Sequence, residues 1–136
     1  MTPEAPARPG PALLTKAGGM LIALLATVAT AVLELFLTPL HVGRVPVCVA
    51  VLLALVANYG ISWFAVETVG RRWAVAPPWA LWTAIMFFAA GVRTTEGDYL
   101  VFGEDLVALV MILVGSLAFA IFAYRVILRG PTVTKL

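Results

Sequence analysis

Four apolar runs, at 17–37, 45–66, 73–92 and 106–124, make up most of the chain, and the last three contain no charged residue. A helix needs about 20 apolar residues to cross a hydrocarbon layer of about 30 Å. Lipid cannot satisfy backbone N–H and C=O groups, and no run alternates like a barrel strand, so each run is predicted to be helical. We therefore predict an all-α membrane protein, an antiparallel bundle with spans at about 17–38, 45–67, 73–93 and 105–128.

Prolines define the ends of the predicted helices. Pro39 stops the first helix, because the residue before a proline is pushed out of the α region, and Pro46 fits the first turn of the second. Pro77 and Pro78 either kink the third helix or start it. If they start it, about 16 helical residues remain after a short interfacial segment at 73–76.

The remaining segments lie outside the predicted transmembrane domain, residues 17–128. Residues 1–16 contain four prolines and are predicted to be a disordered cytoplasmic tail, and residues 129–136 a second cytoplasmic tail. Ala29-Thr30-Ala31 has the small-x-small pattern of a signal-peptide cleavage site. Apolar residues continue through Leu37, which favours an uncleaved span.

Lysine and arginine predict the orientation in the membrane, because the side richer in these residues is cytoplasmic. Seven of them fall on one side of the spans and two, Arg44 and Arg93, on the other. Both termini are thus predicted to be cytoplasmic, and the acidic loop at 94–105 to face outward. The predicted location is the cell membrane, with Trp63, Trp79 and Trp82 in the inner half of their spans.

Composition narrows the functional classes. The 136 residues are 62% hydrophobic and 12% charged, which is too apolar for a soluble domain. The net charge of +2 comes from residues at span ends, so nucleic-acid binding has no support. The single cysteine, Cys48, forms no internal disulfide. We find no catalytic motif and no cofactor motif, and we expect neither an enzyme nor a bound cofactor.

Glu34 is the carboxylate inside the first span, about one turn from its outer end, and it shares a face with Thr27 and Thr30. An ionisable residue inside a span is a functional candidate by default. The structural alternative is an ion pair with Arg93, expected at a similar depth, or with Arg44. A metal site of Glu34 with His41, Glu96 and Asp98 lacks the spacing of a ligand motif.

Asn58 is the second polar candidate. It lies near the middle of the second span, with Ser62 four residues later, so both side chains can face one neighbouring helix. An amide in lipid gains about 0.6 to 2 kcal/mol from a partner on another helix. We expect Asn58 to face the bundle and hold helices together. The small residues Gly115, Ser116 and Ala120 would allow close packing of the fourth helix.

Two family resemblances follow from these features. Four spans with a glutamate in the first resemble, in outline, the small multidrug resistance transporters. In that family the glutamate lies mid-span and the third span carries a Trp-Ser-Gly type signature, where this chain has Trp82-Thr83-Ala84. The Ala, Val and Arg-rich style and the loop Thr95-Glu96-Gly97-Asp98-Tyr99 are similar to small four-span membrane proteins of actinobacteria. Neither resemblance brings functional residues with it.

Two functions remain as hypotheses. The first is an interaction or accessory subunit of the inner membrane, whose partners are the lipid bilayer and another membrane protein or a second copy of the chain. It rests on short loops and on the lack of a continuous polar path across the bilayer. The alternative is a small proton-coupled transporter that acts as an oligomer around Glu34.

Overall fold

The computed structural model describes residues 10–38, 41–42, 45–46, 49–92 and 106–130. Four α-helices dominate it: α1 (Pro11–Leu37), α2 (Val49–Val69), α3 (Ala76–Gly91) and α4 (Leu106–Leu128). A 3₁₀ turn, η1 (Arg72–Val75), leads into α3, and the two-residue strands β1 (His41–Val42) and β2 (Val45–Pro46) pair between α1 and α2. Counting η1 with α3, each of four helices is long and apolar enough to cross a membrane. The predicted all-α class with four spans is confirmed.

The helix ends differ from the predicted ones where proline is involved. Helix α1 already begins at Pro11, where a proline in the first turn costs no hydrogen bond. The prediction for Pro46 is wrong: this residue pairs with His41 in the antiparallel strand pair, and α2 begins only at Val49. Pro77 and Pro78 lie in the first turn of α3, which has 16 residues after the η1 segment, so the starting rather than the kinking role is confirmed.

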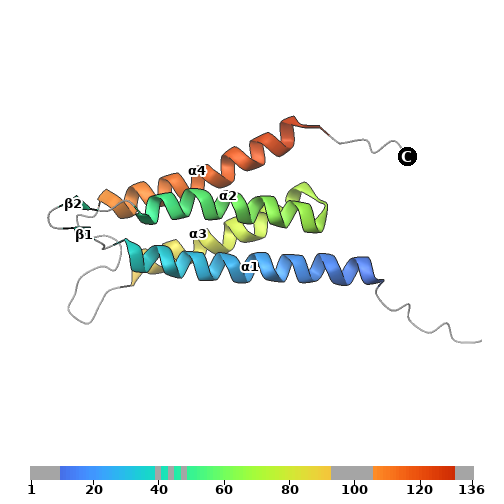
Figure 1. The fold of residues 1–136 in the computed structure, drawn as a ribbon, viewed down its shortest axis with the longest axis horizontal. Coiled ribbons are helices and arrows are strands. Elements are labelled where there is room, and N and C mark those ends of the chain that lie inside the picture. Colours follow the sequence, from blue (N-terminus) through green and yellow to red (C-terminus); the bar gives the residue numbers. More distant parts are fainter. Residues whose placement is uncertain (1–9, 39–40, 43–44, 47–48, 93–105, 131–136) are drawn as a thin grey trace, which may run out of the picture.

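Successive helices run in opposite directions along the bundle (Figure 1). Helix α2 packs most extensively against α1 and α4, whereas α3 lies mainly against α1. Gly19, early in α1, lies beside Thr68, late in α2, and Ala31 clusters with Ala50 and Ala54 at the other end of the pair. The arrangement places α1 and α3 parallel to each other, and likewise α2 and α4.

Stripes of small residues bring α1 and α2 together. The buried face of α1 carries Gly19, Ala23, Thr27 and Ala31, each four residues after the last; Ala23 clusters with Ile61 and Ala65 of α2, and Ala31 with Ala50 and Ala54. A Cβ added at Gly19 would lie 2.5 Å from Thr68 Cβ. Small residues let helix backbones approach closely in lipid, where van der Waals contact rather than hydrophobic exclusion drives association.

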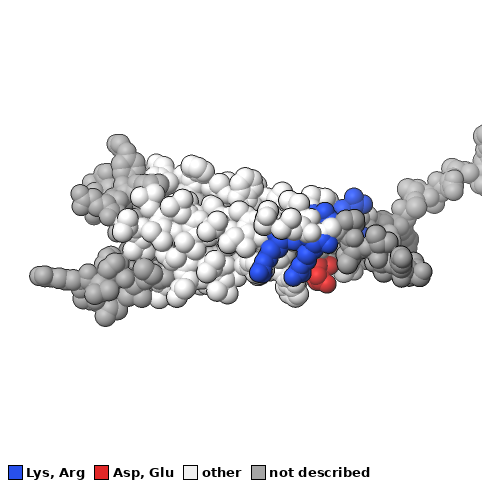
Figure 2. All heavy atoms as spheres, turned by 90° about the horizontal axis from the view of Figure 1, so that it is seen from above, with Lys and Arg blue, Asp and Glu red and all other residues white. Residues whose placement is uncertain are grey.

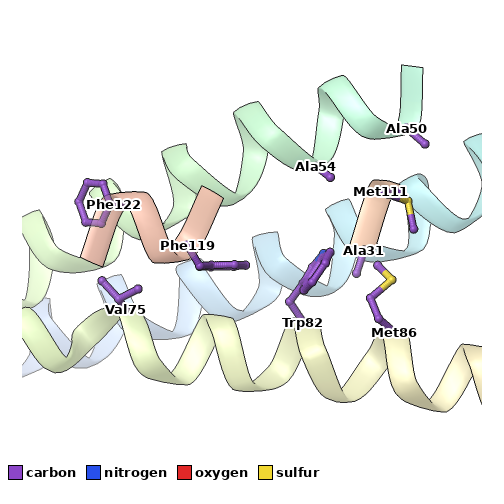
Figure 3. Close-up of a cluster of buried hydrophobic side chains, with 9 residues drawn as sticks. All are labelled: Ala31, Ala50, Ala54, Val75, Trp82, Met86, Met111, Phe119 and Phe122. Carbon is purple, nitrogen blue, oxygen red and sulfur yellow. The ribbon is translucent and has the colours of Figure 1, made fainter. Parts of the chain in front are cut away.

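Large side chains fill the space between the other helices. Figure 3 shows Trp82 and Met86 of α3 facing Met111 and Phe119 of α4, beside the alanines of α1 and α2. The Trp82 and Phe119 rings are tilted by 55° with centroids 5.9 Å apart. On the outside of the bundle, large apolar side chains such as Leu25, Phe36 and Phe87 are exposed, as lipid contact requires.

We expect Gly19→Ala to lower the free energy of unfolding in detergent by about 1–3 kcal/mol, because the added methyl group meets Thr68 between two packed backbones. The neighbouring Gly18 is the matched control, since a Cβ there meets nothing within 4 Å. Gly18→Ala should be neutral or stabilising by up to about 1 kcal/mol, because alanine is the better helix former. Equal effects of the two substitutions would contradict the close approach of α1 and α2.

Candidate functional site

One residue from each helix meets at the centre of the bundle: Glu34 from α1, Asn58 from α2, Trp82 from α3 and Gly115 from α4. We call these four residues the central polar cluster. Glu34, Asn58 and Trp82 are fully buried. The cluster therefore joins groups that are far apart in the sequence and places them out of reach of lipid.

A single hydrogen bond connects α1 to α3. The Trp82 Nε1–H group donates to Glu34 Oε2 over 2.9 Å. An indole nitrogen can only donate a hydrogen bond and a carboxylate can only accept one, so each group is a suitable partner for the other. Burying an ionised carboxylate without a partner is costly, and a hydrogen bond in a medium of low dielectric is stronger than one in water. This contact is thus a principal polar link between the two helices.

Gly115 makes room for the Trp82 ring. A Cβ added at this position would lie 2.5 Å from Trp82 Cζ2 and Cη2 and 3.0 Å from Asn58 Nδ2. The indole and the amide therefore both press against the backbone of α4 at a place where only glycine fits. This contact and the tilted packing on Phe119 hold the ring in position, so that its N–H group points at Glu34.

Asn58 lies inside the bundle, as the sequence predicts, but its polar contacts are few. Asn58 Nδ2 donates to the Gly115 carbonyl at 3.5 Å, which is a long and weak hydrogen bond. Asn58 Oδ1 and Glu34 Oε1 are both buried without a partner among the residues that the structure describes. The central polar cluster thus contains two oxygen atoms whose accepting capacity is unused within the described part of the chain.

Three buried hydroxyl groups, those of Thr27, Thr38 and Ser62, bond within their own helices, whereas Thr83 Oγ1 is buried without a partner among the described residues. Thr27 Oγ1 donates to Ala23 O at 2.8 Å, and Ser62 Oγ donates to Asn58 O at 2.7 Å. Thr38 Oγ1 donates to Glu34 O at 2.8 Å and contacts Met111 Sδ of α4 at 3.4 Å. Bonds to the carbonyl four residues earlier satisfy these hydroxyl groups without a second helix. In the polar stripe predicted on α1, Thr27 and Thr30 are therefore satisfied within their own helix, and Glu34 alone bonds to another helix.

The ion pair predicted for Glu34 stays a prediction. Its proposed partners, Arg93 and Arg44, lie outside the described residues, as do the loop acids Glu96 and Asp98. The structure identifies Trp82 as a partner of Glu34. The sequence pattern groups Trp82 with the aromatic residues of the inner half of the spans and does not indicate this contact. Trp63, Trp73 and Trp79 are indeed exposed, while Trp82 is buried.

A signal for this contact exists in the sequence. A buried tryptophan needs an acceptor for its N–H group, and Glu34 is the carboxylate of the first span. Near the end of α1, Glu34 accepts from an indole that lies beside Gly115, near the middle of α4. Thr38 contacts Met111, and these two residues lie one turn from Glu34 and Gly115 toward the same end of the bundle, so Glu34 is level with the middle of α4.

No family model, no curated protein and no solved structure matches the chain.

We expect strong coupling between Glu34 and Trp82 in a double-mutant cycle. Glu34→Leu leaves the indole N–H unpaired, and Trp82→Phe leaves the carboxyl group unpaired, so each single change should destabilise the protein. The double variant removes both polar groups and should lose about 1–3 kcal/mol less than the sum of the single losses. The measurement is the free energy of unfolding in mixed micelles.

Trp79 provides the control for this cycle, because it lies on the same helix and is 46% exposed. Trp79→Phe combined with Glu34→Leu should be additive to within about 0.5 kcal/mol. Additivity in the Trp82 cycle as well would show that the bond between Glu34 and Trp82 contributes nothing to stability.

Proposed function

We propose that this protein is a multi-pass protein of the cell membrane that acts through contacts with other membrane components, as an interaction or accessory subunit. The observation that supports this proposal best is the position of Glu34. This side chain, the functional candidate of the first span, is fully buried and bonded to Trp82 in the packed interior of the bundle. It stabilises the bundle from within and is not presented to a substrate.

The pockets of the molecule support the same conclusion. One lies between α2 and α4 and another between α3 and α4, and neither is lined by Glu34 or Asn58. The surface that surrounds the spans is apolar, with Leu25, Phe36 and Phe88 among its most exposed side chains. Such a surface suits contact with lipid or with another transmembrane helix, because lipid-exposed polar groups are costly.

The distribution of charge supports an orientation with both termini in the cytoplasm. Seven of the nine lysine and arginine residues belong to the side that carries the termini. Among the described residues, Arg71, Arg72, Arg125 and Arg129 gather near one end of the bundle, with Glu67 beside them (Figure 2). We refer to this end as the basic end. The positive-inside rule assigns it to the cytoplasm.

A proton-coupled transporter is the second candidate, and one observation favours it. Glu34 Oε1 and Asn58 Oδ1 are buried without partners among the described residues. Intramembrane carboxyl groups with unused acceptor capacity are typical of proton relays. In this reading, an oligomer or a second conformation opens a path to Glu34.

Reporter fusions test the orientation. A reporter active only in the periplasm should be inactive when fused after Lys135 and active when inserted at Gly97, because the basic residues hold the termini inside. A reporter active only in the cytoplasm should give the opposite pattern. Periplasmic activity after Lys135 would contradict the proposed topology.

Site-specific photo-crosslinking and proton flux separate the two functions. A crosslinking side chain at Leu25 or Phe36 should give a discrete protein adduct in cells, and one at the buried Ala31 should give none. In liposomes with a pH gradient, neither the unchanged protein nor the Glu34→Gln variant should carry a proton flux. If every exposed position gave lipid adducts alone, the accessory role would be contradicted. A proton flux in the unchanged protein that is lost in Glu34→Gln would establish the transporter.

A further inference from the structure

A pocket of about 660 Å³ opens between α2 and α4 at the basic end of the bundle. Arg71, Arg72, Arg125 and Arg129 all line it, and Glu67 is the acidic residue of its wall. Four guanidinium groups against one carboxylate leave the wall positively charged. The helices separate here, as α4 diverges from α2 toward its C-terminal end (Figure 1).

Aromatic side chains form part of the pocket wall and orient one of its cations. Tyr59, Trp63 and Phe122 line the pocket, and the Tyr59 and Phe122 rings pack edge to face with centroids 5.2 Å apart. Arg125 Nη1 donates to Tyr59 Oη at 3.0 Å. A guanidinium group has five N–H donors, so this bond fixes Arg125 against the wall and leaves its other donors for a ligand.

A second groove, of about 510 Å³, lies on the other side of α4, against η1 and α3. Its wall is nearly all apolar and includes Trp79, Phe119 and Ala120. Arg72 lines both this groove and the pocket between α2 and α4. A charged pocket and an apolar groove therefore share one arginine, which is an arrangement suited to a ligand with a charged head and a hydrocarbon tail.

We propose that the pocket between α2 and α4 binds the phosphodiester headgroup of an anionic phospholipid, and that an acyl chain of the same lipid lies in the groove against α3. Arginine forks match phosphate oxygens with paired, charge-assisted hydrogen bonds. Basic pockets between transmembrane helices at the cytoplasmic side are recognised sites for acidic headgroups. The apolar groove beside Arg72 favours a lipid over a free phosphate, because a soluble anion has no hydrocarbon chain that could fill the groove.

Lipid retention measured by native mass spectrometry tests the proposal on the unchanged protein. From micelles that contain equal amounts of dioleoyl phosphatidylglycerol and dioleoyl phosphatidylcholine, the protein should retain the phosphatidylglycerol about tenfold more often. Phosphatidylglycerol should also raise the melting temperature, whereas glycerol phosphate added to phosphatidylcholine micelles should not. Equal retention of the two lipids would overturn the proposal. If glycerol phosphate raised the melting temperature as much as phosphatidylglycerol does, the pocket would bind a free phosphate group rather than a lipid.

Matched variants separate the pocket from general attraction between a basic protein and anionic lipid. Arg72→Gln and Arg125→Gln should each abolish most of the preference for phosphatidylglycerol. Lys16→Gln removes the same charge from an exposed position on α1 that does not line the pocket, and it should keep the preference. An equal loss in Lys16→Gln, or an unchanged preference in both arginine variants, would show that surface charge alone attracts the lipid.

Discussion

The hydrogen bond between Trp82 and Glu34 solves a problem that hydrocarbon imposes on this fold. A carboxyl group and an indole N–H are both costly to expose to lipid, and neither can turn to water in the interior of the bundle. Threonine and serine avoid this cost by bonding to their own helix, as Thr27 and Ser62 do. Glu34 and Trp82 bond to each other across the bundle instead, so the same contact that satisfies them also fixes α3 relative to α1.

Close packing supports this polar contact. The small residues that face each other along α1 and α2 bring the two backbones together, and Gly115 lets Trp82 lie directly against α4. A larger residue at Gly115 would displace the indole and with it the donor that Glu34 needs. The glycine thus acts on the carboxyl group through the tryptophan, although it has no polar side chain of its own.

The spans, their number and the buried position of Asn58 follow from the sequence, because span length and an isolated amide in an apolar run are local features. The sequence leaves a start or a kink at the two prolines of α3, and the structure shows the start. Other features depend on which helices are neighbours, and a single sequence does not specify that. The partner of Glu34, the pairing of the small-residue stripes and the four arginines around one pocket all belong to this class. The strand pair that contains Pro46 has only two residues on each side, which is too short for an alternating pattern to show in the sequence.

The position of α3 has a consequence for how the protein is made. Together with η1, α3 is the least apolar of the four spans; η1 lies against α2, and α3 itself packs mainly on α1. Such a segment partitions weakly from the translocon into lipid by itself and gains from a neighbour that is already inserted. Helix α1 enters first and carries the acceptor that Trp82 requires. We therefore expect insertion of the third segment to depend on the first, so that a defect at Glu34 would reduce the yield of correctly inserted chains before it affected any mature protein.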